Sequence, residues 1–416
     1  MAPMTLDSTA ALLLKGYAWL PDRRRRTGGA PVRTRLLGRP AIALHGPEAV
    51  RFFYDEQHVR RHDALPGPVL DTLFGRGAVH TLDGEDHRVR KALFMTELTE
   101  PAAVAELVDM VRAEWQRAFA PPHGREVVLF DEAALVLARA ACAWTGLPLT
   151  EEQTRRMAQD CVAMVDGFAT PGPRHLKARR ARARQEEALA GLVEEARAGA
   201  TRAPATPFDA VVRHRDADGA LLDARTAAVE LLNIVRPTVA IAWFVTFAAH
   251  AMDRWPEQRH LLREDDGSYA EPYTETYAEP FAHEVRRFYP FAPFVGGLAA
   301  TDLRWRGEHV PEDTLVLLDV YGQNHDPELW HDPYRFDPER FLRPTPHRDE
   351  LIPQGGGDAK SGHRCPGEDI TVAVLAALST ELARLECSVP EQDLRIPLHR
   401  VPTRPRSGFR LVPHPA

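Results

Sequence analysis

The sequence predicts a mainly α-helical fold with a small β region. Amphipathic segments, with apolar residues at helical spacing, fill most of the chain between about residues 84 and 375. Strand-like patterns are confined to about 31–45, 296–320 and 387–412. The 416 residues contain no internal repeat and no linker, so we expect one domain over residues 1–416.

Turn and helix signals define the N-terminal elements. Gly38-Arg39-Pro40 predicts a hairpin turn between two short strands. A short helix is expected to begin at Pro47, because proline is favoured in a first helical turn. Asp83 is expected to cap the next helix, with Asp86 in the reciprocal position of a capping box.

The middle of the chain is predicted to be helical and its end to form strands. A strand is expected at TLVLLDV, and the proline-punctuated stretch after it is interpreted as an ordered loop. The final segment, from Cys387 to Val412, predicts a strand pair around Ser407-Gly408. The expected long helices lie at 102–119, 131–144, 151–165, 176–198, 223–252 and 277–289.

Composition excludes several classes of protein. The net charge of -7 argues against a nucleic-acid binder, and the four cysteines form no CxxC pair that would indicate zinc or a disulfide scaffold. The N-terminus lacks the pattern of a signal peptide. The most apolar stretch, Thr238 to Met252, is too short to span a bilayer. We therefore expect a soluble, cytoplasmic protein without an integral membrane segment.

Cys365 is the strongest candidate for a metal ligand. It directly precedes Pro366-Gly367-Glu368 and an apolar helix, and the N–H groups of a helix N-terminus stabilise a thiolate. Nearby glycines allow the backbone to approach a flat cofactor, and His363 and Arg364 offer donors to its carboxylates. The alternative is a buried structural cysteine.

The stretch GHRCPGE resembles the haem-thiolate loop of the cytochrome P-450 superfamily. This resemblance implies the cytochrome P-450 fold enclosing haem b, with Cys365 as the axial ligand of the iron. The preceding residues read Ile-Pro-Gln-Gly-Gly-Gly, whereas the superfamily pattern starts with Phe and has fewer residues before the cysteine. This departure resembles the fatty-acid peroxygenases, which hydroxylate or decarboxylate fatty acids with hydrogen peroxide.

Two further motifs match the same superfamily. Glu284 and Arg287 share a helix face and resemble its structural ExxR pair, with Arg340 as the expected third member. His87 and Lys91 also project from one face, and the resemblance implies that they pair with haem propionates, with His363 as a third candidate. For these pairs, a surface ion pair and an exposed basic helix face are the respective alternatives.

Arg236 lies in a helix so apolar that we expect it to be buried. Pro237 removes a helical hydrogen bond, so a kink is expected there. A buried arginine without an anionic partner costs several kcal/mol, and the nearest acid, Glu230, is six residues away and off its face. We therefore interpret the missing anion as a substrate carboxylate. The alternative is an arginine that snorkels from a helix end.

The resemblance extends to the Arg236-Pro237 pair. Oxygen-using cytochromes P-450 carry an acid–alcohol pair in this helix, whereas the fatty-acid peroxygenases carry Arg-Pro. The resemblance implies that hydrogen peroxide is the co-substrate, that no redox partner is obligatory, and that the carboxylate held by Arg236 assists O–O cleavage.

His80 is predicted to lie over the haem. In the peroxygenase branch this position is generally Gln or His, and His resembles the members that make terminal alkenes. Phe74, Phe291 and Phe294 are candidates for the channel that holds the fatty-acid chain, with ordinary core packing as the alternative.

The sequence therefore predicts a haem-thiolate enzyme that oxidises medium- or long-chain fatty acids at the α or β carbon with peroxide. The expected products are 2- or 3-hydroxy fatty acids and, by decarboxylation, terminal 1-alkenes. Catalytic roles fall to Arg236, Pro237 and His80. Two alternatives stay open: a reductase-dependent monooxygenase of another substrate, and a non-catalytic haem sensor or fatty-acid carrier.

Overall fold

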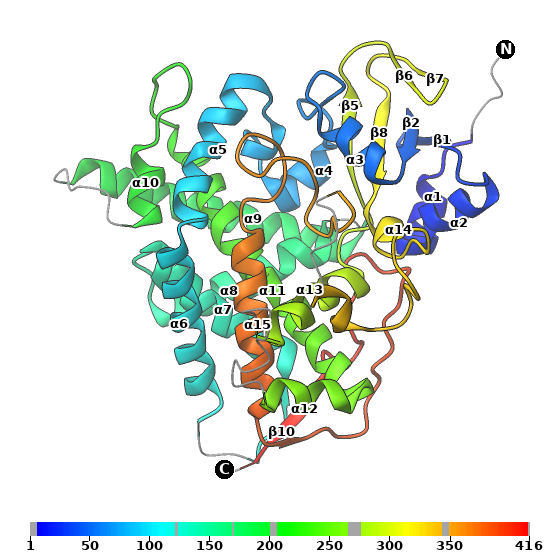
Figure 1. Cartoon of the computed structure of the whole chain (residues 1–416). Coiled ribbons are helices and arrows are strands. Elements are labelled where there is room, and N and C mark those ends of the chain that lie inside the picture. Colours follow the sequence, from blue (N-terminus) through cyan, green and yellow to red (C-terminus); the bar gives the residue numbers. More distant parts are fainter. Residues whose placement is uncertain are drawn as a thin grey trace.

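The computed structural model describes residues 6–120, 124–168, 170–199, 206–264, 276–342 and 349–414. Helices make up most of the molecule, and several of the strands gather near the N-terminus (Figure 1). The mainly α prediction with a small β region is therefore confirmed. The α-helices are α1 (Thr9–Lys15), α2 (Trp19–Arg26), α3 (Pro47–Tyr54), α4 (Gly67–Val69), α5 (Gly84–Leu98), α6 (Pro101–Ala118), α7 (Leu129–Thr145), α8 (Glu151–Gly167), α9 (Pro173–Ala198), α10 (Pro207–Arg213), α11 (Ala224–Arg254), α12 (Pro256–Glu264), α13 (Ala278–Phe288), α14 (Val320–Asn324) and α15 (Glu368–Arg384).

The strands form a main sheet and two small ones. The main sheet has the order β1-β2-β8-β5-β3, in which β2 and β8 are parallel and the other neighbours are antiparallel. The predicted hairpin joins its first two strands, with Val32 opposite Ala43. The strands are β1 (Val32–Leu36), β2 (Arg39–Leu44), β3 (Val59–Arg60), β4 (Val127–Val128), β5 (Phe294–Ala299), β6 (Leu303–Trp305), β7 (Glu308–Val310), β8 (Leu315–Asp319), β9 (Cys387–Ser388) and β10 (Arg410–Pro413).

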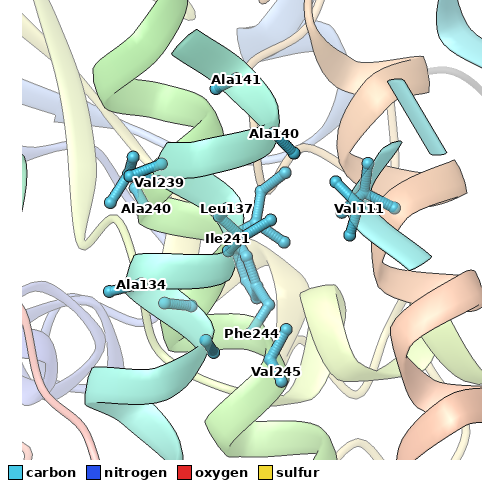
Figure 2. Packing of buried hydrophobic residues seen from close by; sticks show 14 of the residues in the cluster. Val111, Ala134, Leu137, Ala140, Ala141, Val239, Ala240, Ile241, Phe244 and Val245 are labelled. Carbon is cyan, nitrogen blue, oxygen red and sulfur yellow. The ribbon is translucent and has the colours of Figure 1, made fainter. Parts of the chain in front are cut away.

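Helix α11 forms the centre of the core. It packs against α7, α8, α9 and α15, and residues from Ala227 to Met252 are buried almost without interruption. Figure 2 shows how Leu137 of α7 meets Ile241 and Phe244 of α11. Because the apolar side chains in its middle turns face protein on all sides, α11 brings the charged residues of these turns, Glu230 and Arg236, into the interior.

The burial of α11 also explains its hydropathy. The helix is long and apolar enough to cross a membrane by length and composition, but 94% of its most apolar window is buried inside the protein. Such burial is typical of a core helix. Helical structure continues without a break through Pro237.

Two local predictions are wrong. Asp83 is the N-cap residue of α5, but its side chain makes no capping bond, because both carboxylate oxygens accept the backbone N–H groups of Arg61 and His62. The capping box with Asp86 is therefore absent. At the C-terminal end, β9 and β10 form the predicted strand pair, but no hairpin at Ser407-Gly408 joins them, because β9 already ends at Ser388 and these two residues lie just before β10.

Candidate active site

Cys365 lies in the loop that leads into α15, drawn in orange in Figure 1. Its N–H donates to the carbonyl of Gln354 at 3.3 Å, and Gln354 Nε2 lies 3.7 Å from Cys365 Sγ. Burial raises the pKa of the thiol, while hydrogen bonds from the Gly367 backbone and Gln354 lower it. The helix start therefore lowers the pKa of the Cys365 thiol, as predicted. Because burial raises it, a thiolate here needs a cation as counter-charge.

A buried ion-pair network fixes this loop to two helices. Glu368 accepts a hydrogen bond from Arg364 Nε at 2.7 Å and also pairs with Arg286 of α13. Arg286 Nε in turn donates to Gln354 Oε1 at 3.0 Å, which orients the amide towards the sulfur. Sequence reasoning missed the roles of Gln354 and Arg286, whose only signal was their position inside the two motifs.

His87, Lys91 and His363 come together beside the cysteine loop. The rings of His87 and His363 stack with centroids 3.9 Å apart, and Lys91 Nζ donates to the carbonyl of Arg364. Burial is the largest cause of the lowered pKa of all three groups; neighbouring cations lower the pKa of His87 and His363 further, whereas Cys365 and Asp358 raise that of Lys91. The alternative of an exposed basic helix face is wrong for His87 and Lys91, because both side chains are buried.

Arg61 is a fourth member of this cluster that sequence reasoning missed. Its guanidinium lies 4.2 Å from the ring centroid of Phe53 and 5.4 Å from that of Tyr54. Buried polar atoms without a hydrogen-bond partner among the described residues gather here: Arg61 Nη1, His87 Nδ1 and His363 Nε2. Such donors are suited to the carboxylates of a bound group. Arg61 follows strand β3 directly, where no periodic pattern marks a residue as inward-facing.

Arg236 lies in the middle of α11 with 4% of its surface exposed, so it does not snorkel from a helix end. Its Nη1 is buried and has no hydrogen-bond partner among the described residues. Burial lowers the pKa of the guanidinium to about 9, and the charge of Arg182 contributes. An arginine in this state has a strong affinity for an anion that can replace water.

Glu230 does not supply an anion to Arg236, because its carboxylate pairs with another cation. Its carboxylate accepts hydrogen bonds from Arg90 Nη1 at 2.7 Å, from the backbone N–H of Val79 at 2.8 Å and from Asn233 Nδ2 at 2.9 Å. The prediction that Glu230 does not pair with Arg236 agrees with this geometry. The same contacts attach the segment around Val79 to α11.

Phe74 and His80 meet Arg236 from the segment before α5. The ring of Phe74 lies 4.7 Å from that of His80, and the Arg236 guanidinium lies 5.7 Å from the Phe74 ring centroid. His80 Nδ1 is buried without a partner among the described residues. Burial and the charge of Arg236 hold the pKa of His80 well below its usual value, so its imidazole is neutral at pH 7. The three side chains thus form one cluster that combines a cation, unpaired among the described residues, with a neutral donor–acceptor.

The other two aromatic candidates, Phe291 and Phe294, lie in two different hydrophobic clusters. Phe291 packs against Phe244 of α11, with ring centroids 5.0 Å apart, and belongs to the main helical core. Phe294 packs against Trp19, with centroids 6.0 Å apart, in a cluster with the β-sheet. The position of Phe294 favours core packing over a place beside Arg236.

Glu284 and Arg287 form a fully buried ion pair. Arg287 Nε and Nη2 both donate to the Glu284 carboxylate at 2.7 Å, and Arg340 Nε lies 3.2 Å from the same group. Arg287 Nη1 also donates to the carbonyls of Asn324 and Pro333. The pair is therefore not a surface contact, and it attaches α13 to the loop after α14.

Comparisons with known proteins agree with this arrangement. The cytochrome P450 family model matches residues 272–411. Among solved structures, a variant of cytochrome P450SP alpha (CYP152B1) is 40% identical, with a TM-score of 0.92, and the match covers 98% of this chain and 99% of that one. The chain belongs to the CYP152 family of cytochromes P450.

Two other CYP152-like structures are bound to fatty acids. Cytochrome P450EX alpha (CYP152N1) with myristic acid is 37% identical, has a TM-score of 0.90, and the match covers 99% of each chain. A variant of cytochrome P450 OleT in complex with arachidonic acid is 34% identical, has a TM-score of 0.91, and the match covers 100% of each chain.

More distant relatives match over varying lengths. The cyclooctat-9-en-7-ol 5-monooxygenase of Streptomyces melanosporofaciens is 25% identical, over 87% of this chain and 90% of that protein. The mitochondrial cytochrome P450 4e5 of Drosophila mettleri is 27% identical, but the match covers only 36% of this chain and 30% of that protein.

The residues present fit the haem that this family implies. A single cysteine stands at a helix start with donors around its sulfur, as an axial thiolate requires. Arg61 Nη1 and His87 Nδ1 are buried without a hydrogen-bond partner among the described residues. His363, whose Nε2 lies 3.6 Å from Asp83 Oδ1, and Lys91 lie beside them, and this set of donors suits two propionates. Arg236 Nη1 and His80 Nδ1 are also buried without a hydrogen-bond partner among the described residues.

Proposed function

We propose that this chain is a haem-thiolate fatty-acid peroxygenase that oxidises medium- or long-chain fatty acids with hydrogen peroxide. The observation that carries the proposal is Arg236, a buried guanidinium that has no anionic partner among the described residues and that lies against Phe74 and near His80. A fatty-acid carboxylate supplies the missing charge through a bidentate contact. The apolar residues around α11 receive the chain.

Haem b, held by Cys365 through its iron and by Arg61, His87, Lys91 and His363 through its propionates, supplies oxidising power when peroxide is present. Arg236 binds the carboxylate and places the α and β carbons at a fixed distance from the oxidising centre. The bound carboxylate accepts and returns a proton of hydrogen peroxide while the O–O bond breaks. Neutral His80, which lies near Arg236, is available as a second proton donor or acceptor.

Two overall reactions follow from this geometry. Hydroxylation converts the acid and one peroxide into a 2- or 3-hydroxy acid and water. Decarboxylation converts the acid and one peroxide into a 1-alkene, carbon dioxide and two waters. We propose that the enzyme is soluble and cytoplasmic, and that no redox partner is obligatory because peroxide already supplies both oxidising equivalents.

Product analysis tests the proposal. Purified holoenzyme receives myristic acid and hydrogen peroxide without reductase or NAD(P)H, with catalase added in a control. Hydroxy acids or a 1-alkene that disappear with catalase are the expected result. A normal thiolate-type carbon-monoxide spectrum without product would contradict it. Product that forms only with redox partners would then identify a reductase-dependent monooxygenase, and tight acid binding without turnover would identify a carrier.

Arg236→Ala tests the carboxylate contact. We expect fatty-acid turnover to fall by about 100-fold or more, because the substrate loses both its orientation and the proton relay. Haem content and the carbon-monoxide spectrum should stay unchanged. Arg254→Ala, on the exposed last turn of the same helix, is the matched control and should keep its activity. Unchanged turnover in Arg236→Ala would contradict the mechanism.

A further inference from the structure

The segment that carries Phe74 and His80 has an unusual backbone. Residues Leu70–Phe74 form a π-helix, and Val79–Thr81 form a 3-10 turn, with Gly75 ending the first of these elements. Single π turns are rare and often lie at functional sites. Neither element is stabilised by the hydrogen-bond pattern of a regular α-helix, so contacts from elsewhere must hold the two side chains against Arg236.

Arg182 of α9 supplies such contacts to the π-helix. Its Nη1 donates to the carbonyl of Leu73 at 2.7 Å, and its Nη2 donates to the carbonyl of Phe74 at 2.9 Å. These carbonyls lie at the C-terminal end of the element, where no helical N–H follows. Only 2% of Arg182 is exposed, so water does not compete for either bond.

A carboxylate shared between two helices holds Arg182 itself. Glu186, one turn further along α9, accepts from Arg182 Nε at 2.6 Å. Its other oxygen accepts from Arg225 Nε and Nη2 of α11 at 3.2 and 3.1 Å. Every nitrogen of the Arg182 guanidinium is thus engaged, and its direction is fixed relative to both α9 and α11.

Gly75 shows how closely the guanidinium approaches the backbone. Its φ is +88°, a conformation that favours glycine, and a Cβ at this position would overlap Arg182 and the side chain of Val229. The chain therefore accepts the arginine only because residue 75 has no side chain.

We infer that Arg182 is a positioning residue for fatty-acid oxidation: by binding the carbonyls of Leu73 and Phe74, it keeps the Phe74 ring against His80 and Arg236. This inference rests on the proposed function. It assigns to α9 a share in the choice between hydroxylation and decarboxylation, because that choice depends on how firmly the acid and His80 are held. Arg182 touches neither substrate nor cofactor in this account.

Arg182→Lys tests the inference, with Arg184→Lys as the matched control. Lysine keeps the positive charge opposite Glu186 but loses the planar fork that binds two carbonyls at once. Arg184 lies on the same helix and pairs with Asp160 at 2.6 Å, but its side chain is 47% exposed and forms no hydrogen bond with the π-helix among the described residues. Both variants therefore lose one bidentate arginine contact.

Two measurements are made on each holoenzyme. In Arg182→Lys, amide hydrogen exchange over residues 70–75 should quicken by about tenfold or more, since the segment opens more often. The ratio of 1-alkene to hydroxy acid from myristic acid should change by about twofold or more, since the reacting carbons are held less firmly. Arg184→Lys should match the wild type in both. A general loss of stability would shift the unfolding midpoint without changing the product ratio.

Gly75→Ala provides a second test from the other side of the contact, in case Arg182→Lys folds poorly. It should reproduce both effects, because the new methyl group pushes the guanidinium from the carbonyls. Unchanged exchange, or quicker exchange with an unchanged product ratio, would overturn the inference. A wild type that forms no product would instead refute the proposed function, and the exchange measurement would still decide whether Arg182 holds the segment.

Discussion

Several ionisable side chains of this protein are buried where water cannot stabilise their charged form. Arg236 is one example, and its burial is the basis of the proposed carboxylate contact. Asp319, at the end of β8, is another. One of its oxygens accepts the N–H of Gly322 at 2.8 Å, while the second is buried without a partner among the described residues. Burial raises the pKa of Asp319 to about 6.

Asp319 predicts a pH-dependent stability. Its pKa in an unfolded chain is near 3.8, so the folded state binds more protons between pH 4 and 6, and stability is lost as the pH rises through 6. A shift of this size corresponds to about 3 kcal/mol at most. Asp319→Asn should therefore stabilise the protein, and its gain should be about 1 kcal/mol larger at pH 8 than at pH 5.

Urea unfolding at the two pH values measures this gain. Asparagine keeps an oxygen acceptor for Gly322, so the N-terminal cap of α14 is retained. Asp109→Asn, whose side chain is 79% exposed, is the control. An equal gain for Asp319→Asn at pH 5 and pH 8 would show that Asp319 is already ionised at the lower pH.

At the scale of elements, α11 organises the site by holding other segments at defined points. Glu230 binds the backbone N–H of Val79 and the side chain of Arg90, so the His80 turn and α5 are both attached to the helix that carries Arg236. His80 and Arg236 are therefore distant in sequence, but both are attached to the same helix, α11.

Glu230→Gln should weaken this support. The amide retains an acceptor for Val79, but Arg90 loses the buried charge opposite its Nη1 and keeps Asp216 and the carbonyl of Gly77 as partners. We expect the free energy of unfolding to fall by about 2 kcal/mol, and amide exchange at residues 78–81 to quicken. Glu187→Gln, at an exposed position of α9, should change neither quantity. An unaffected exchange rate would mean that Glu230 does not hold the His80 turn.

At the scale of the molecule, buried ion pairs connect the helical part to the long irregular stretch before the cysteine loop. Arg287 reaches from α13 to the carbonyls of Asn324 and Pro333, and Glu284 accepts the N–H of Asp337 at 2.9 Å. Figure 1 shows this stretch in yellow and orange between α14 and α15. Apart from the short 3-10 helix at Pro338–Phe341, the described residues of this stretch form no helix or strand, so these contacts define their course.

Glu284→Gln should therefore affect the whole molecule. Its loss leaves Arg287, which is completely buried, opposite a neutral amide, and removal of one partner of such a pair costs about 3–5 kcal/mol. Thermal unfolding of the holoenzyme should occur at a clearly lower temperature, with earlier loss of haem. Glu279→Gln, on the same helix at a side-chain exposure of 45%, is the control. An unfolding temperature equal to that of the control would contradict a structural role.

The sequence by itself determined the helices and the chemistry of the motifs. Periodic apolar residues marked α6, α7, α8, α9, α11 and α13 to within a few residues, because amphipathic spacing is a local property. Cys365 and Arg236 were recognisable because each residue type conflicts with its surroundings: a cysteine among glycines at a helix start, and an arginine inside an apolar run.

Only the tertiary structure decided which side chains face one another. Asp83 has the sequence signal of a helix cap, but the backbone N–H groups of Arg61 and His62, the two residues after β3, occupy its carboxylate. Arg61, Gln354 and Arg182 carry no periodic signal, because their partners lie outside their own helix or strand: Phe53 belongs to α3, Cys365 to the cysteine loop and Phe74 to the π-helix. Local propensity fixes a residue's element, whereas burial and pairing depend on which elements pack together.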